Sequence, residues 1–373
     1  MDDVFSQDTD ASLIWDGFLV DNVRPLGPEE LDRFANKRIL ITGGGGYLGS
    51  ALARALAALP IADLVLLDHS EYGLYKLDQD FRDTGQTPPA SLIVGSVIDR
   101  VLLDEIFSKH APQIIFHTAA LKHVPLMQAN AFAAAETNAL GTHTLVEAVK
   151  RSRVSRFVFL STDKAVDPIS IMGATKRIGE QIVLRARDRD PDRFVAFRLC
   201  NVLGSTGSVA PAFASQIAAG LPLTLTHAEA TRFFISRTDA VRYLLRAAIM
   251  PSETGLLIPR LCEAHRVQDL AAFLLQRTGC ARQGRMVETG LRSGDKLHEQ
   301  LISLSEHAQP SLDHEMLAIH SPFDRGDLAD ALTAIQNAVS SRDPLRLFQA
   351  IRSVVPGYGD EDAASKLFNE AIA

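Results

Sequence analysis

Residues 38–49 read RILITGGGGYLG, an apolar segment that runs directly into a glycine-rich loop. The apolar part predicts a buried strand, and residues 47–59, rich in alanine and leucine, predict a helix that ends before Pro60. Glycines at this junction allow a tight turn and a close approach to a pyrophosphate, which the free amides of the helix N-terminus would bind. A purely structural glycine turn is the alternative. Between a strand and a helix, the pattern predicts a dinucleotide-binding loop formed by Gly43, Gly46, Tyr47, Leu48 and Gly49.

The alternation of apolar strand and helix continues beyond this loop. Further buried strands are predicted at 63–67, 92–94, 114–116, 157–160 and 194–197. Helices are predicted between them, at 71–83, 99–109, 129–152 and 173–188. Strands that are apolar throughout and alternate with helices are typical of a parallel sheet covered on both faces. The predicted fold class is therefore α/β, a doubly wound parallel sheet of the Rossmann type with a smaller substrate-binding lobe.

An acidic residue, Asp68, ends the second predicted strand. A carboxylate at this place accepts hydrogen bonds from both hydroxyls of an adenosine ribose and repels a 2′-phosphate. The next three residues, His69-Ser70-Glu71, contain no arginine that would bind such a phosphate. The sequence therefore favours NAD over NADP as the cofactor.

The strict alternation ends near residue 200, and this change divides the chain. Glycine, proline, threonine and short amphipathic helices mix beyond that point, which indicates a lobe over the carboxyl edge of the sheet. The extension at the N-terminus contains the only tryptophan, Trp15, and either packs on the body or a partner subunit or is a partly disordered leader. Four parts are expected: the N-terminal extension, 1–36; the NAD-binding domain, 37–200; the mainly substrate-binding lobe, 201–322; and a C-terminal helical segment, 323–373, with helices near 327–340 and 343–354.

Composition and charge exclude several classes of protein. Hydrophobic residues make up 46% and charged residues 22% of the 373 residues, which is usual for a globular protein. The net charge of −7 argues against a general binder of nucleic acid or of anionic membranes. No apolar run is long enough to span a membrane, and the acidic start is neither a secretory signal nor a transit peptide. The spacing of the three cysteines fits no set of metal ligands, so we predict no metal site. We interpret them as reduced residues of a cytoplasmic protein; they are Cys200, Cys262 and Cys280.

Ionisable side chains gather directly after the predicted strand at 157–160. The stretch Ser161-Thr162-Asp163-Lys164 follows that strand, and Lys176 comes next, four residues after Met172. A helix would place Met172 and Lys176 on one face. Charges at the end of a core strand are costly to desolvate unless they face a ligand or a cleft, whereas a surface turn is the alternative for Asp163 and Lys164.

Six blocks of sequence carry a resemblance to a known family. They are AALKHVPLM at 119–127, NALGT at 138–142, STDKAV at 161–166, NVLGSTGSV at 201–209, TLTHAEATRFF at 224–234 and GLRSGDKLHE at 290–299. In this order they resemble the extended short-chain dehydrogenase/reductases, and most of all the nucleotide-sugar 4,6-dehydratases that act on UDP-N-acetylglucosamine. The resemblance covers about residues 37–305. That superfamily uses a Tyr-x-x-x-Lys pair, and here Met172 stands at the tyrosine position, as in related sequences of this group.

The resemblance implies two sets of binding residues. Beyond the glycine loop and Asp68, NAD would contact Ser96, Val97, Ala119, Ala120, Lys122, Asn138 and Lys176. The UDP-sugar would contact Lys122, His123, Asn201, Ser208, Val209, Thr224, Arg232, Arg292 and Asp295. Within that set, Arg232 and Arg292 would face the diphosphate, because a planar guanidinium binds two oxygens at once, and Asp295 would hold the uridine ribose.

The resemblance also implies a reaction. The hexose is oxidised at C4, loses water across C5 and C6 and is reduced at C6, so that NAD is regenerated. Lys164 would be the base at C5, with a pKa lowered by desolvation and by Lys176, and Asp163 the acid for the C6 oxygen, with a pKa raised by burial. Thr162 would bind the C4 oxygen and Lys176 the nicotinamide ribose, whereas the thioether of Met172 cannot accept the C4-hydroxyl proton.

Two other functions share these features. A UDP-sugar 4-epimerase has the same fold and cofactor, but it does not need the Asp163–Lys164 pair and normally relies on the absent tyrosine. A non-catalytic dinucleotide-binding regulator would have kept the fold and lost the tyrosine. The apolar helices at 129–152 and 173–188 suggest a homo-oligomer, at least a helix-paired dimer.

Overall fold

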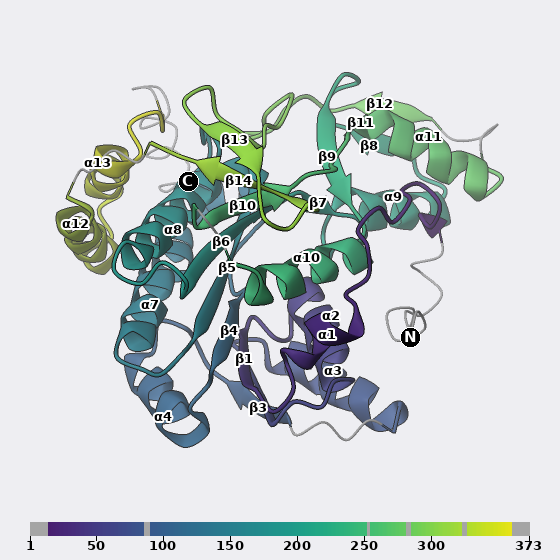
Figure 1. The fold of residues 1–373 in the computed structure, drawn as a ribbon. Helices are drawn as coiled ribbons and strands as arrows, with labels where there is room; N and C mark the ends of the chain where they lie inside the picture. Colours follow the sequence, from purple (N-terminus) through teal and green to yellow (C-terminus); the bar gives the residue numbers. More distant parts are fainter. Residues whose placement is uncertain (1–13, 86–89, 252–253, 281–284, 323–326, 360–373) are drawn as a thin grey trace.

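The fold is built on one large sheet. A computed structural model describes residues 14–85, 90–251, 254–280, 285–322 and 327–359. Its main strands are β1 (Arg38–Thr42), β2 (Asp63–Asp68), β3 (Ala90–Val94), β4 (Ile114–His117), β5 (Arg156–Thr162), β6 (Phe194–Leu199), β10 (Leu256–Pro259), β13 (His307–Pro310) and β14 (Met316–His320). They form a nine-stranded sheet in the order β13-β14-β10-β6-β5-β4-β1-β2-β3 (Figure 1). Every pairing from β10 to β3 is parallel, which confirms the predicted parallel sheet, and the last two pairings at the other edge are antiparallel.

Helices cover both faces of this sheet, as the doubly wound fold requires. One face carries α2 (Tyr47–Ala57), α3 (Glu71–Asp83) and α10 (Arg237–Ile249), and the other carries α4 (Arg100–His110), α7 (Thr142–Lys150) and α8 (Ile171–Arg187) (Figure 1). The strands β1, β2, β4, β5 and β6 between them are largely buried and form the main core. β3, which was expected to be buried, is the edge strand of the sheet and is only partly buried, with Val94 exposed. The six strands predicted before residue 200 are confirmed, with ends within a few residues.

The helix predicted at 129–152 is divided in the structure. It comprises α5 (Val124–Ala129), α6 (Ala131–Ala134), a π-helical turn η3 (Ala135–Gly141) and α7. Asn130, between α5 and α6, leaves the helical conformation with φ −128° and ψ 49°. π-helical turns inside helices are frequent at functional sites, and this one carries Asn138.

A smaller lobe stands beside the carboxyl ends of the parallel strands. It consists of β7 (Asn201–Val202), α9 (Val209–Ala218), β8 (Leu223–Leu225), β9 (Thr231–Ile235), β11 (Ala264–Arg266), α11 (Val267–Arg277) and β12 (Met286–Glu288). These elements enclose a second hydrophobic core. The range 201–322 expected for the lobe is thus not continuous, because α10, β10, β13 and β14 fall within it and pack on or extend the large sheet.

The described part of the N-terminal extension packs on the body. Ile14, Trp15 and Phe18 contact the second core, and the backbone amides of Asn22 and Val23 donate to the carboxylate of Asp239 at 2.8 and 3.3 Å. The extension then forms the short helix α1 (Pro28–Asp32). This agrees with the first alternative for residues 14–36, and residues 1–13 lie outside the described residues.

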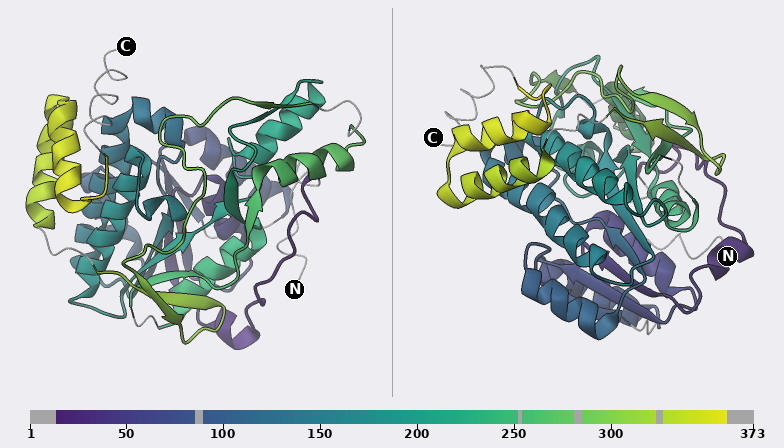
Figure 2. Two further views of the ribbon diagram at one scale, coloured as in Figure 1. Left: turned by 90° about the horizontal axis from the view of Figure 1, so that it is seen from above. Right: turned by 60° about the vertical axis from the view of Figure 1, so that its left-hand side comes forward.

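The two predicted C-terminal helices are present as α12 (Leu328–Ser341) and α13 (Pro344–Val354). They lie side by side against η3, α6 and α8 (Figure 2). The Gln181 amide of α8 donates to the Val354 carbonyl at 2.6 Å, which fastens α13 to the body. Part of the apolar surface from which we expected a dimer is therefore covered by the chain itself, and the expected homo-oligomer stays a prediction.

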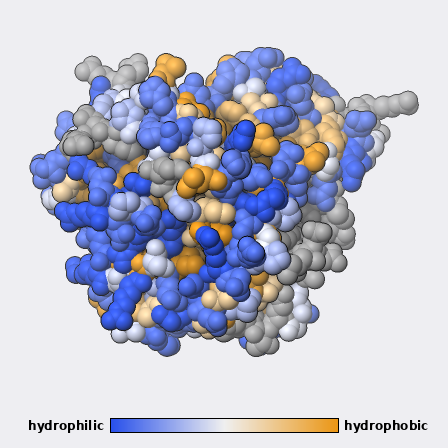
Figure 3. Space-filling view, in the orientation of Figure 1, coloured by the Kyte–Doolittle hydropathy of each residue, from blue (hydrophilic) through white to orange (hydrophobic). Residues whose placement is uncertain are grey.

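The surface is largely hydrophilic on the face drawn in Figure 3, with apolar residues in small groups. Among the described residues, no helix combines the length and apolar character needed to cross a membrane.

Candidate functional site

The glycine loop between β1 and α2 is too crowded for side chains. Gly43 has a φ of +76°, and a Cβ on it would lie 2.6 Å from the backbone nitrogen of Ala119. A Cβ on Gly49 would lie 2.0 Å from the Gly43 carbonyl oxygen. Tyr47 and Leu48 open α2, and the Tyr47 hydroxyl donates to the Leu203 carbonyl at 3.0 Å. Because the loop packs this closely on the helix, a pyrophosphate could approach the backbone amides at the N-terminus of α2. This arrangement fits a dinucleotide.

Asp68 fastens this loop to the end of β2. Its carboxylate accepts hydrogen bonds from the backbone nitrogens of Gly45 at 2.9 Å and Ser70 at 2.8 Å, and the residue is buried. Ser96 and Val97 follow β3 at the same edge of the sheet, with Val97 packed close to Gly141. The predicted contacts of Asp68, Ser96 and Val97 with a bound nucleotide stay predictions.

Asn138 holds the loop that follows β4. This buried amide accepts from the Leu121 nitrogen at 2.8 Å, donates to the Leu121 carbonyl at 3.0 Å and donates to the Thr175 hydroxyl at 3.1 Å. Its described bonds therefore position the segment of Ala119, Ala120 and Lys122. Lys122 follows Leu121 in that segment, and desolvation of its ammonium by surrounding atoms lowers the pKa of Lys122.

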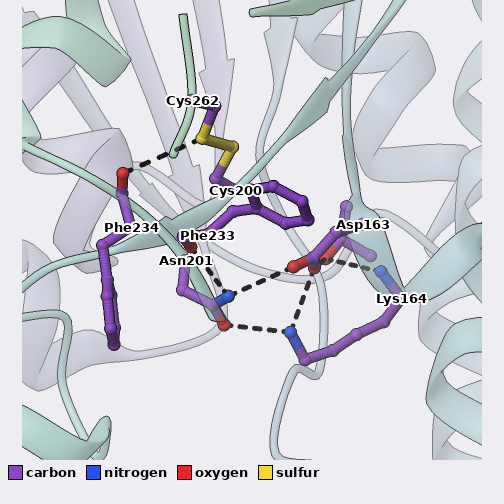
Figure 4. The surroundings of a disulfide bond; sticks show 8 residues. Asp163, Lys164, Cys200, Asn201, Phe233, Phe234 and Cys262 are labelled. Atoms are coloured by element: carbon purple, nitrogen blue, oxygen red, sulfur yellow. Dashed lines mark hydrogen bonds and ion pairs between the residues drawn. A yellow bond between two sulfur atoms is a disulfide. The ribbon is translucent and has the colours of Figure 1, made fainter. Parts of the chain in front are cut away.

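The predicted catalytic pair lies at the carboxyl end of β5, in a single 3₁₀ turn (Figure 4). Asp163 is fully buried and Lys164 is partly buried. Lys164 Nζ donates to Asp163 Oδ1 at 3.0 Å and to Asn201 Oδ1 at 2.9 Å. Asn201 Nδ2 in turn donates to Asp163 Oδ2 at 3.1 Å, and the Thr162 hydroxyl donates to Asp163 Oδ1 at 2.8 Å. The structure thus brings together four residues that the sequence assigned to one site.

The pKa of Lys164 differs from the expectation. Burial alone lowers the pKa of Lys164, but the carboxylates of Asp163 and Glu299 outweigh it and leave this pKa above its usual value. Glu299 Oε1 lies 3.7 Å from Lys164 Nζ. The expectation of a lowered pKa was wrong, because Lys176 is not among the groups that act on Lys164 and a second carboxylate is. The sequence reasoning assigned no role to Glu299, although the residue lies within the sixth sequence block.

Met172 and Lys176 lie one turn apart on α8, both buried. The Lys176 ammonium donates to the Leu160 carbonyl and lies 4.1 Å from the centre of the Phe159 ring. Burial lowers the pKa of Lys176 to about 7, and Glu180 opposes this shift only in part. Of the two lysines, Lys176 therefore has the pKa closer to neutral pH.

The residues expected to meet a substrate fall into two groups. His123 and the loop before α9 are in contact, since a Cβ on Gly207 would lie 2.4 Å from the His123 ring. Burial and the neighbouring Lys122 lower the pKa of His123. Ser208 caps α9 and precedes Val209, and its buried hydroxyl makes no hydrogen bond within the described parts of the chain. A buried hydroxyl without a partner is costly and favours a ligand at this place.

The second group is engaged with protein atoms. Arg232 donates to the carbonyls of Thr231, Leu297 and Lys296 at 2.7, 3.1 and 2.9 Å. Arg292 and Asp295 bind each other at 2.8 Å. The Thr224 hydroxyl, on the small β8–β12 sheet, accepts from Gln216 at 2.8 Å. The contacts of these four residues with a nucleotide stay predictions.

Two cysteines close to Asp163 and Lys164 correct the expectation of three reduced thiols. Cys200 and Cys262 form a disulfide, with Cα atoms 7.5 Å apart, and Cys280 is free (Figure 4). The two residues follow β6 and β10, which are parallel neighbours, so the pairing of these strands brings them together. Cys200 directly precedes Asn201, which is hydrogen-bonded to Asp163 and Lys164.

Comparison with known proteins agrees with this geometry. The profile of the polysaccharide biosynthesis protein family matches residues 39–321. The chain belongs to this family. The Staphylococcus aureus capsular polysaccharide biosynthesis protein CapD is 37% identical over 288 residues, 75% of this chain and 48% of CapD. A UDP-glucose 4-epimerase of Rickettsia massiliae is 34% identical over 284 residues, 74% of this chain and 80% of that protein.

A solved structure resembles this polysaccharide biosynthesis protein as well. DesIV, a dTDP-glucose 4,6-dehydratase from Streptomyces venezuelae determined with NAD bound, has a TM-score of 0.59 and 25% identity. The match covers 71% of this chain and 88% of DesIV. The chain spans about half the length of the first curated relatives it matches.

Proposed function

We propose that this polysaccharide biosynthesis protein is an NAD-dependent nucleotide-sugar 4,6-dehydratase acting on UDP-N-acetylglucosamine. The observation that carries the proposal is the direct contact of Asp163 and Lys164, at 3.0 Å, at the carboxyl end of β5, on the same edge of the parallel sheet as the glycine loop after β1. A dehydration needs a base and an acid close together, and an epimerisation does not. The likeness to CapD and to DesIV, whose names are of a capsule protein and a 4,6-dehydratase, supports the same choice.

NAD, when bound, would accept and return a hydride, and its pyrophosphate would lie on the crowded loop of Gly43 and Gly49. Lys176, which is buried on α8, would bind the nicotinamide ribose. The chemistry of water loss falls to the chain's own residues. In the resting site Lys164 carries the proton and Asp163 accepts three hydrogen bonds.

One proton transfer along the contact of Lys164 with Asp163 gives the pair its working form, a neutral amine and a carboxylic acid. The amine of Lys164 then removes the C5 proton of the oxidised sugar. Asp163 donates its proton to the C6 oxygen, which leaves as water while the C5–C6 double bond forms. Both residues are then at their resting charges. The return of a hydride to C6 requires a proton at C5, which Lys164 would give back, and the proton released from the C4 hydroxyl would then restore the ammonium of Lys164, so that the cycle balances.

A UDP-sugar 4-epimerase is the second candidate, and one observation favours it. The Rickettsia relatives that match over most of their length bear the name UDP-glucose 4-epimerase. Against it stands Met172, which is buried and cannot exchange a proton as the tyrosine of an epimerase does. A non-catalytic regulator would have no need of the Asp163–Lys164–Asn201 cluster.

The test is to incubate the protein with NAD and UDP-N-acetylglucosamine and to determine the product mass. We expect a product lighter by one water, and no such product from Lys164→Ala although NAD still binds. Lys150→Ala, at an exposed lysine of α7 paired with Glu147, is the matched control and retains activity. A product of unchanged mass supports the epimerase, and full activity of Lys164→Ala contradicts the proposal.

A further inference from the structure

Glu299 is a buried carboxylate directed at the reactive lysine. The residue is 7% exposed, and Oε1 lies 3.7 Å from Lys164 Nζ. Its other oxygen, Oε2, is buried and has no hydrogen-bond partner among the described residues. A carboxylate held away from water with one oxygen unsatisfied is costly, so its placement here requires a compensating interaction.

The segment around Glu299 is fastened from two sides. On one side it runs along β9, where the Thr231 nitrogen donates to the Leu297 carbonyl at 3.0 Å and Arg232 binds the Lys296 carbonyl at 2.9 Å. On the other side, Lys296 Nζ donates to the carbonyl of Val166 at 2.6 Å, two residues after Lys164. These bonds fix the distance between Glu299 and the turn that carries the catalytic pair.

Four charged groups act on the Lys164 ammonium from the elements around it. Asp163 comes from its own turn, Glu299 and Lys296 from the segment before β13, and Arg232 from β9. Asp163 and Glu299 attract the ammonium, and the two cations repel it. Without Glu299, the Lys164 ammonium would have the attraction of Asp163 alone against the repulsion of Arg232 and Lys296. The charged form of Lys164 would then be less favourable relative to the neutral amine.

We propose that Glu299 is a positioning residue for Lys164, which holds the ammonium beside Asp163 and Asn201 and controls how readily it releases its proton. The proposal deepens the dehydratase function and rests on it for its catalytic meaning, since there Lys164 must become neutral to take the C5 proton. Its primary test does not require turnover.

The test measures how fast Lys164 is acetylated by trace acetic anhydride at about pH 8, with exposed Lys109 as the internal reference and mass spectrometry as the readout. Only the neutral amine reacts, so the rate reports the neutral fraction. An opposite charge at this distance shifts a pKa by about 1–3 units, so Glu299→Gln is expected to raise the rate at least tenfold. Glu299→Met, which also removes the charge at similar length, gives the same result.

Two controls separate charge from altered packing. Glu299→Asp retains the charge and is expected to keep the Lys164 rate within about twofold of the wild-type protein, a small change beside the rise expected when the charge is lost. Asp167→Asn removes an exposed carboxylate of the same region, bonded to Ser303, and leaves the rate unchanged. Thermal unfolding verifies that each variant is folded.

The outcomes distinguish this inference from the proposed function. An unchanged Lys164 rate in folded Glu299→Gln and Glu299→Met overturns the inference, as does an equal rise in Glu299→Asp, which would mean only that the cleft has opened. If the rate rises as expected and kcat/KM for water loss extends to lower pH in Glu299→Gln, both are supported. If the rate rises but no protein releases water, Glu299 positions Lys164 and the dehydratase function is refuted.

Discussion

Lys176 should make the stability of the cofactor-free protein depend on pH above neutrality. Its pKa is about 7 in the folded protein and 10.5 in an unfolded chain, because burial disfavours the ammonium. Above pH 10.5 both states hold the neutral amine, and folding carries no penalty. As the pH falls towards 7 only the unfolded chain gains the proton, so stability falls with it, and below pH 7 both states are charged and this dependence ends.

The size of the effect follows from the shift. Each pKa unit corresponds to about 1.4 kcal/mol, so the full window amounts to about 5 kcal/mol and the interval from pH 7 to pH 9 to about 2 kcal/mol. We expect the free energy of unfolding in urea to rise by that amount more in the wild-type protein than in Lys176→Met. The comparison is made at both pH values without NAD, because a bound ligand adds its own stabilisation. Lys109→Met, at an exposed lysine, should follow the wild-type protein. If wild type and Lys176→Met gain the same stability between the two pH values, the low pKa of Lys176 is refuted.

Two further predictions concern the loop and the cysteines. Gly49→Ala places a Cβ 2.0 Å from the Gly43 carbonyl oxygen, and the overpacking costs about 1–3 kcal/mol, so this variant should bind NAD more weakly in a fluorescence titration. Gly357→Ala, where a Cβ would have nothing within 4 Å, should bind NAD normally. Equal affinity of the two variants for NAD would contradict the role of the loop. Alkylation of the unreduced, denatured protein should modify Cys280 alone, and prior reduction should also expose Cys200 and Cys262. Modification of all three without reduction would show that the disulfide does not form.

Local pattern was enough to predict the first half of the fold. Strands such as β1 and β5 are apolar throughout and lie between helices with clear ends, so periodicity and glycine content determine them with little help from distant residues. The edge strand β13 has no such pattern, because every one of its four residues is exposed. It is a strand only because β14 lies beside it, and that pairing depends on the three-dimensional arrangement.

The cysteine pair shows the same limit at the level of chemistry. Cys200 and Cys262 are 62 residues apart and carry no recognisable spacing. They meet because β6 and β10 are neighbours in the sheet although β7, α9, β8, β9 and α10 separate them along the chain. Strand order of this kind is a property of the whole fold, and the sequence of either segment does not contain it.

The structure brings the predicted residues Thr162, Asp163, Lys164 and Asn201 together, but the expected direction of the Lys164 pKa was wrong. Adjacent Asp163 and Lys164 could be recognised as a pair, and Lys176 as a nearby cation that would favour a neutral Lys164. In the structure Lys176 faces an aromatic ring and a carbonyl, whereas Lys164 faces a second carboxylate from a distant block. Environment therefore separates the two lysines: the carboxylates of Asp163 and Glu299 leave the pKa of Lys164 above its usual value, and burial lowers the pKa of Lys176 to about 7.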